Sequence, residues 1–218
     1  MKHLKRQSIP KSWPVHRKGS TFVVKPNSNV EKGIPMLVVL RDLMKIAQNR
    51  KEVKNALHNK NILLNGKFVK EDKNSAMLFD VISDVPAKKN YKITMNENGK
   101  FRAEEIKESE AGMKISKIIN KKSLKNKKVQ LNLYDGRNFV SDLKCNVGDS
   151  VVVNFKNKKA EKCLPLQEKA SVIVFAGKHA GRTGEIEKIN LERRMASVKS
   201  SGSDGTKINV LLKQLMVI

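Results

Sequence analysis

The sequence has 218 residues and carries 45 Lys and Arg against 21 Asp and Glu, a formal net charge of +24 at pH 7. Its recurrent apolar segments argue against disorder throughout, and none approaches the roughly 20 residues that a membrane helix needs. Two cysteines, Cys145 and Cys163, are too few for a disulfide scaffold, and no apolar block follows the basic N-terminus. We therefore expect a cytoplasmic protein without a signal peptide. So large a charge favours a polyanionic partner, nucleic acid first and an anionic membrane surface second.

Residues 1–32 are predicted to form a basic extended arm. The first 20 residues contain six basic side chains and no acid, and Pro10, Pro14 and Pro26 disfavour a helix. Such an arm is compatible with ordering along a phosphate backbone only on binding, or with a disordered tail. The single Trp13 argues against the tail, since a tryptophan usually packs on something.

Residues 33–84 are predicted to form a domain of two helices and a hairpin. Pro35 suits the first turn of a helix over about 35–48, and a second helix is expected over 51–58. The apolar stripe of the first helix consists of Leu37, Leu40, Met44 and Ala47.

Asn65-Gly66 lies between two β-prone runs and predicts a tight hairpin turn, because both turn positions favour positive φ. Residues 77–82 are predicted to form one further strand. Basic side chains near the hairpin are compatible with one RNA-facing surface or with ordinary solvated helix charges. They are Arg41, Lys45, Lys51, Lys54, Lys60, Lys67 and Lys70.

Residues 85–163 are predicted to form a central β-rich domain. Short alternating runs are separated by Asn98-Gly99 and Asp135-Gly136 turns, a pattern typical of a small barrel. We also expect a short charged helix over Ala103–Glu110 and a basic loop over Lys121–Lys128.

Residues 164–218 are predicted to form a second small barrel that contains a glycine-rich loop at 176–184. Gly177 and Gly181 enclose three residues rather than the four of a nucleotide-binding P-loop, and the next segment alternates like a strand. The loop therefore fits a tight crossing between strands, with Gly177, Gly181 and Gly184 as structural glycines, or a simple turn. Lys178, His179 and Arg182 would stand at its rim, where they could meet phosphate.

Catalysis and metal binding find little support in the sequence. The four histidines are scattered, the two cysteines are 18 positions apart, and no spacing fits a zinc site. We expect no enzyme activity, no metal and no cofactor.

Four segments together resemble the archaeal and eukaryotic (e-type) family of small-subunit ribosomal protein S-four. They occur in the family's order and span nearly the whole chain. They are the arm His3–Trp13, the helix–hairpin segments from Ile34 to Lys67, Phe79–Ile82, and the KOW-like motif Val174–Ile186.

This resemblance implies an α+β protein: the arm (1–32), a helix–helix–hairpin RNA-binding domain (33–84), a central β domain (85–163) and a KOW-type barrel (164–218), with both barrels SH3-like. It implies an archaeal ribosomal component that binds small-subunit rRNA by shape and phosphate contacts, beside neighbouring ribosomal proteins. A non-ribosomal RNA-binding factor of transcription or RNA processing is the alternative, and membrane binding is not expected.

The residues expected to contact RNA are mostly basic. They are Lys2, His3, Lys5, Arg6, Lys11, Trp13, Arg17, Lys18, Arg41, Lys45, Lys51, Lys54, Lys60, Asn65, Lys67, Lys70, Lys178, His179 and Arg182, and the structural glycines include Gly66.

Overall fold

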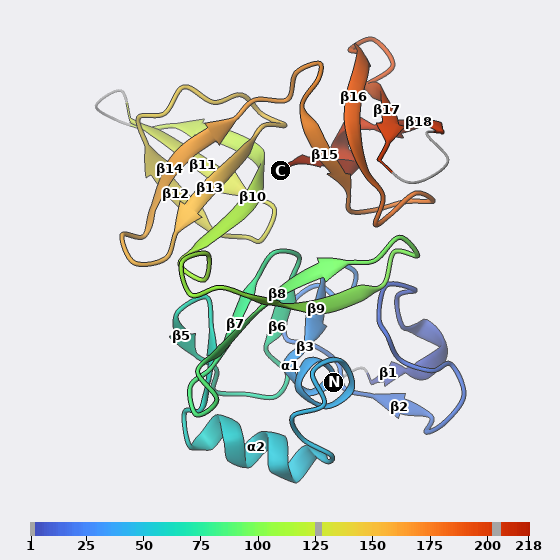
Figure 1. Ribbon diagram of the computed structural model, residues 1–218, viewed down its shortest axis with the longest axis vertical. Coiled ribbons are helices and arrows are strands. Elements are labelled where there is room, and N and C mark those ends of the chain that lie inside the picture. The colour runs from blue at the N-terminus through green and yellow to red at the C-terminus, as the bar shows by residue number, and fades with distance from the viewer. Residues whose placement is uncertain (1–2, 125–127, 202–205) are drawn as a thin grey trace. The chain divides into compact units, whose positions relative to one another are not determined.

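The computed structural model describes residues 3–124, 128–201 and 206–218. They form two compact units (Figure 1). The first contains the described residues up to Thr94 together with Lys100–Gly112, and the second contains Met95–Gly99 and the described residues from Met113 to Ile218. Within the described residues, no helix is long and apolar enough to cross a membrane.

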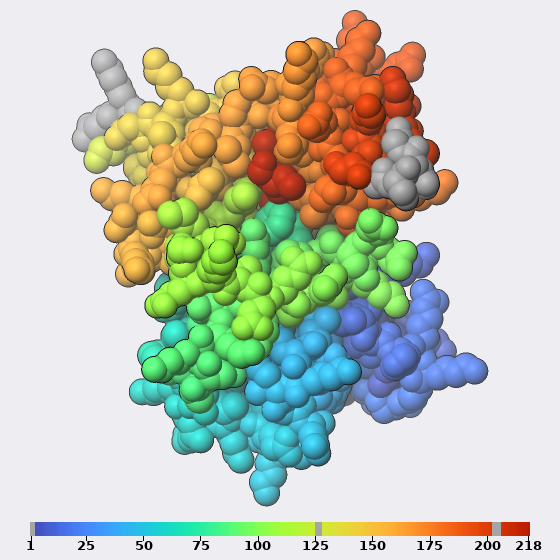
Figure 2. All heavy atoms as spheres, viewed as in Figure 1, coloured from blue at the N-terminus to red at the C-terminus, as the bar shows by residue number. Residues whose placement is uncertain are grey.

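The arm packs against the rest of the first unit. Strand β1 (Leu4–Lys5) pairs antiparallel with β2 (Phe22–Val23), with the short helix η1 (Arg6–Ser8) after β1. Trp13 is only 2% exposed, and its indole N–H donates to the carbonyl oxygen of Gly33 at 3.1 Å. Figure 2 shows the arm, in dark blue, against the light-blue segment that follows. Trp13 is therefore packed, as the sequence argument against a disordered tail expected, and the β1–β2 pair folds the chain back between residues 5 and 22.

The first predicted helix is shorter than its apolar stripe indicates. Helix α1 (Met36–Val38) continues as the wider helical turn η2 (Val39–Leu43), in which the N–H of Met44 donates to Val39 five residues back. Lys45 then has a φ of 55°, which ends the helix before 48. Ala47 is still buried, so the last apolar position of the predicted stripe reaches the core from a non-helical turn.

Helix α2 (Arg50–His58) confirms the second predicted helix. It begins at the N-cap Asn49, whose side-chain oxygen accepts from the N–H of Glu52 at 3.0 Å. The Glu52 carboxylate accepts in turn from the N–H of Gln48 at 2.7 Å, in the manner of a capping box. Val53 and Leu57 form its buried side.

The first unit contains a five-stranded sheet in the order β5-β4-β7-β8-β9. Its strands are β4 (Ile62–Leu64), β5 (Lys67–Phe68), β7 (Val81–Asp84), β8 (Lys89–Met95) and β9 (Phe101–Ile106). A separate pair joins β3 (Gly33–Pro35) to β6 (Ser75–Met77). The single strand predicted over 77–82 is thus two strands, because Phe79, with a φ of 62°, turns the chain between them.

The second unit contains a curled antiparallel sheet in the order β12-β11-β10-β13-β14, whose edge strands β12 and β14 contact each other. The strands are β10 (Met113–Ser123), β11 (Val129–Leu133), β12 (Asn138–Ser141), β13 (Ser150–Asn154) and β14 (Lys159–Leu164). The helix predicted over Ala103–Glu110 is wrong, because pairing with β8 makes its first half strand β9. The predicted basic loop starts later than expected, because Lys121–Ser123 belong to strand β10, and residues 125–127 lie outside the described residues.

A second antiparallel sheet of this unit has the order β18-β17-β16-β15-β19. Its strands are β15 (Ser171–Val174), β16 (Thr183–Asn190), β17 (Met195–Ser200), β18 (Lys207–Leu211) and β19 (Leu215–Val217), with the short helix η4 (Leu212–Gln214) before the last. Each sheet has its own apolar cluster, one around Val172 and Val198 and the other around Ile118 and Val151. Over the residues that the structure describes, the chain is therefore mostly β with two short α-helices, and the α+β expectation gives helix too much weight.

Candidate nucleic-acid interface

A basic hollow of about 790 Å³ lies in the first unit between the arm and the end of the first helix. The arm brings residues 14–18 opposite residues 41–48, which are more than 20 positions away in sequence. Its cationic lining consists of Arg6, Lys18, Arg41 and Lys45, against the single acid Asp42. The hollow therefore gathers four of the predicted RNA-contacting side chains in one concave surface.

Two arginines of this hollow have fixed positions. The guanidinium of Arg41 donates to both carboxylate oxygens of Asp42 at 2.9 Å, and this hydrogen bonding raises the pKa of Arg41 despite partial burial. The guanidinium of Arg6 donates to the backbone oxygens of Ser20 at 2.6 Å and His16 at 2.7 Å, and to the Ser20 hydroxyl at 2.8 Å. Arg6 thus holds the loop that forms one wall, a structural task that sequence reasoning did not predict.

A second basic hollow, of about 570 Å³, lies between helix α2 and residues 70–73. Its cationic lining consists of Arg50, Lys54, Lys70 and Lys73, and His58 also lines it. The Nε of Arg50 pairs with the buried carboxylate of Asp72 at 2.5 Å, which anchors the start of the helix to this segment. Arg50, His58 and Lys73 were not among the predicted contacts, since only the pairing of α2 with a distant segment gives them a shared surface.

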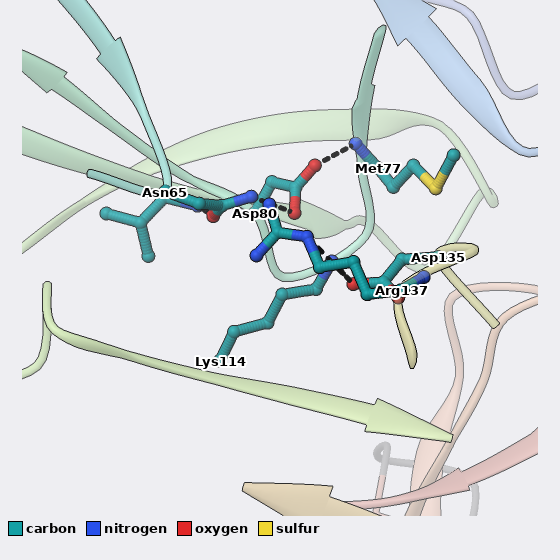
Figure 3. A network of polar contacts seen from close by, with 7 residues as sticks. Asn65, Met77, Asp80, Lys114, Asp135 and Arg137 are labelled. Carbon is teal, nitrogen blue, oxygen red and sulfur yellow. Dashed lines mark hydrogen bonds and ion pairs between the residues drawn. The ribbon is translucent and has the colours of Figure 1, made fainter. Parts of the chain in front are cut away.

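Asn65 is a structural residue rather than a surface contact. It is 4% exposed; its side-chain N–H donates to Asp80 at 2.7 Å, and its side-chain oxygen accepts from the N–H of Val81 at 2.9 Å (Figure 3). The other Asp80 oxygen accepts from the N–H of Met77 at 2.7 Å. With φ values of 52° and 73°, Asn65 and Gly66 confirm the predicted turn.

Burial also removes Trp13 from the predicted RNA contacts, because its indole fills the core beside Gly33. Lys2 lies outside the described residues. The remaining predicted residues of the first unit are exposed, in the arm, on helix α2 and around the hairpin. They are His3, Lys5, Lys11, Arg17, Lys51, Lys60 and Lys67.

The glycine-rich loop of the second unit has a backbone role at Gly181. Its φ is 91°, and a Cβ added there would lie 1.7 Å from the carbonyl oxygen of Asn96, so that close backbone approach excludes any side chain. A Cβ at Gly177 would meet the Gln214 side chain at 2.8 Å, and one at Gly184 the Lys199 carbonyl oxygen at 2.1 Å. At the rim, Lys178 is exposed, whereas His179 and Arg182 are half-buried.

The arrangement suits binding rather than catalysis. Among the residues that the structure describes, no group of three His, Cys, Asp or Glu side chains is placed to hold a metal ion. Concave surfaces lined by Lys and Arg are suited to a folded polyanion, because each cation that contacts a phosphate releases counterions.

Two family profiles match the chain. The one described as Ribosomal family S4e covers residues 87–160, and the one described as RS4NT (NUC023) domain covers residues 1–28. The first covers the central β-rich part, where the sequence motifs of the resemblance are thinnest, and the second covers the arm.

Archaeal proteins and one solved structure are similar over most of the chain. The small ribosomal subunit protein eS4 of Methanocella arvoryzae is 36% identical over 197 residues, 89% of this chain and 83% of the relative. The eS4 protein of Haloarcula marismortui is 36% identical over 193 residues, 87% of this chain and 82% of the relative. The crystal structure of 30S ribosomal protein S4e from Thermoplasma acidophilum shares the fold, with a TM-score of 0.73 at 24% identity, covering 86% of this chain and 95% of that one. The chain therefore belongs to the eS4 (S4e) family of small ribosomal subunit proteins, which are structural proteins rather than enzymes.

Proposed function

We propose that this protein binds small-subunit rRNA through shape and phosphate contacts, and that the first unit carries most of the interface. The observation that carries the proposal is the pair of basic hollows that collect arginine and lysine side chains from three separated segments. Folded RNA presents phosphates and 2′-hydroxyls in a fixed shape, and such surfaces recognise it without reading sequence.

The finer organisation belongs to the same proposal. We assign the arm to residues 1–32, the helix–hairpin module to 33–84, a central SH3-like barrel to 85–163 and a KOW-type barrel to 164–218. The loop with Lys178, His179 and Arg182 would add phosphate contacts, and exposed parts of both sheets would meet rRNA or neighbouring ribosomal proteins.

Salt dependence of rRNA binding tests the interface. Each phosphate contact adds about 0.7–0.9 to the slope of log K against log [salt]. We expect the magnitude of that slope to be smaller by roughly 1.5 in a variant that carries Lys18→Gln in one hollow and Lys54→Gln in the other. The matched control is Lys88→Gln with Lys107→Gln, two exposed lysines that line neither hollow.

Sedimentation tests the ribosomal assignment. The wild-type chain should migrate with small subunits in a sucrose gradient at low salt. A chain that remains at the top of the gradient would contradict the proposal, and one that binds RNA but never sediments with subunits would favour the non-ribosomal RNA-binding alternative.

A further inference from the structure

A third hollow in the first unit, of about 570 Å³, has a composition unlike the other two. It lies between the β1–β2 pair and the segment around Lys73, and it combines apolar, aromatic and cationic side chains. Among the described residues that line it none is acidic, whereas the other two hollows include Asp42, or Glu71 and Asp72. We infer that this hollow receives one unstacked RNA nucleotide, an inference that rests on the proposed rRNA binding.

The aromatic component is Phe22. Its ring is 5.4 Å from that of His3, centre to centre, at an interplanar angle of 52°, and yet Phe22 stays 55% exposed. The contact with His3 holds the Phe22 ring in place but leaves much of its apolar surface exposed to water, which is unfavourable. An unstacked base is the RNA group that would cover such a ring, since stacking on an aromatic side chain is how single-stranded bases are commonly held.

The cationic component consists of Lys25, Arg50 and Lys73. Lys25 is exposed beside the aromatic pair, and Lys73 is half-buried on the opposite wall. The pair with Asp72 at 2.5 Å keeps the Arg50 guanidinium at this wall. Because Asp72 pairs with Arg50, Lys25 and Lys73 are the side chains suited to contact the phosphates on either side of a single nucleotide.

The two walls are joined by hydrogen bonds, so the hollow is a preformed feature. The N–H of Asn27 donates to the carbonyl oxygen of Lys73 at 3.0 Å, and its side-chain N–H donates to Glu71 at 2.9 Å. The Ser28 hydroxyl donates to that of Ser75 at 2.7 Å. Binding therefore needs little ordering of the protein, which favours a small, specific occupant.

Size and chemistry distinguish a nucleotide from other occupants. The volume falls within the roughly 300–1,000 Å³ of small-ligand sites, which holds one nucleotide and excludes a duplex. Bases within a duplex are stacked on both faces and cannot reach an aromatic ring. A nucleotide supplies both an aromatic face and adjacent phosphates, matching both components of the lining.

Binding of a nine-residue oligouridylate to the full chain tests the inference. We expect Phe22→Leu to weaken its affinity about tenfold without changing the salt slope, because stacking releases no counterions. Phe22→Tyr should restore affinity, whereas Lys73→Gln should lower the slope by about 0.7. The matched control is Phe68→Leu, since Phe68 is equally exposed, at 53%, but lines none of the three hollows.

A positive signal comes from cross-linking with 4-thiouridine at the centre of the same oligonucleotide. The cross-link should fall on the tryptic peptide of residues 19–32, which contains Phe22 and an uncleaved Lys25-Pro26 bond. The fluorescence of Trp13, the only tryptophan of the sequence and buried in this unit, verifies folding of each variant.

Three outcomes would each overturn the inference. The cross-links could be confined to other peptides, or Phe22→Leu and Phe68→Leu could weaken the affinity for the oligonucleotide equally. A nine-base-pair duplex could also compete for binding as strongly as the single strand does. These outcomes leave the proposed function intact if the same variants still sediment with small subunits. If the wild-type chain does not sediment with small subunits, both the proposed function and this inference are contradicted.

Discussion

The ammonium of Lys117 on strand β10 donates to the carbonyl oxygen of Leu215 at 2.5 Å, and so joins the two sheets of the second unit. It also donates to the carbonyl oxygen of Leu212 at 2.5 Å and lies 5.9 Å from the centre of the Phe175 ring. The Ser150 hydroxyl accepts from the N–H of Val217 at 2.9 Å beside it. Lys117, which is 5% exposed, is thus a buried cation whose hydrogen bonds are accepted by backbone oxygens.

Burial lowers the pKa of Lys117 to about 8 from its ordinary 10.5, so the side chain is charged at pH 7. Between these two values the unfolded chain binds the proton that the folded chain has released, and stability contributed by this group rises with pH. We expect the unfolding free energy of the wild type, relative to Lys117→Met, to increase by up to about 3 kcal/mol between pH 7.5 and 10.5. Urea denaturation of both proteins measures the difference, and a difference independent of pH would contradict the assignment.

Lys114 and Asp135 form a buried ion pair at 2.9 Å, with side-chain exposures of 3% and 7% (Figure 3). Burial alone would raise the pKa of Asp135, but the charge and hydrogen bond of Lys114, with help from Arg137, hold that pKa below its ordinary 3.8. Asp135→Asn should cost roughly 1.5–3 kcal/mol at pH 7, because it removes a buried carboxylate that accepts a charged hydrogen bond from the Lys114 ammonium.

The stabilisation from Asp135 is present above pH 4 and is lost as the pH falls through the lower folded-state pKa. The difference in unfolding free energy between the wild type and Asp135→Asn should therefore become smaller below pH 4. Glu187→Gln is the control, since Glu187 pairs with Lys207 at 2.9 Å while that lysine side chain is 70% exposed. It should cost less than about 1 kcal/mol, and an equal cost for both variants would refute the buried-pair account.

Gly181→Ala should destabilise the second unit by about 3 kcal/mol or more. The added Cβ would lie 1.7 Å from the Asn96 carbonyl oxygen, and a φ of 91° is unfavourable for any L side chain. Gly112→Ala is the matched control, because nothing lies within 4 Å of a Cβ there. Thermal denaturation of the two variants decides the point, and similar melting temperatures would show that the loop does not need this glycine.

Arg6→Ala should loosen the arm in the free protein and weaken RNA binding as a consequence. The guanidinium holds two backbone oxygens and one hydroxyl in the loop that ends at Ser20, and Arg6→Lys lacks the planar fork to replace it. Hydrogen exchange of the amides of residues 16–22 should quicken in both variants. Lys5→Ala, at an exposed neighbouring position, should leave exchange unchanged; if all three variants exchange alike, Arg6 has no structural task.

Local signals in the sequence predicted local structure well. The Asn65-Gly66 turn and helix α2 follow from neighbouring residues, because turn φ values and the Asn49–Glu52 cap involve only nearby groups. Residues Ala103–Ile106 were misassigned to a helix and belong to strand β9, since pairing with β8 outweighs the helix propensity of Ala and Glu.

The candidate site was predictable in its residue types but not in its shape. Lys18 and Arg41 were selected for their charge, yet only the folded arm brings them to one hollow. Trp13 was assigned to RNA because its partner, the carbonyl oxygen of Gly33, is 20 residues away and leaves no local pattern. Contacts at such separations depend on the whole fold, which a single sequence does not display.

The hydrogen bonds of the arm to its own unit alter the thermodynamics of assembly. Trp13 is anchored to Gly33, and the carbonyl oxygen of its neighbour Ser12 accepts from the N–H of Phe101 at 2.8 Å. The basic side chains on both sides of this anchor, including Lys11 and Arg17, are consequently displayed from a fixed backbone before any RNA arrives. Under the proposed rRNA binding, association would then be the docking of two preformed surfaces, with a small heat-capacity change, rather than folding coupled to binding.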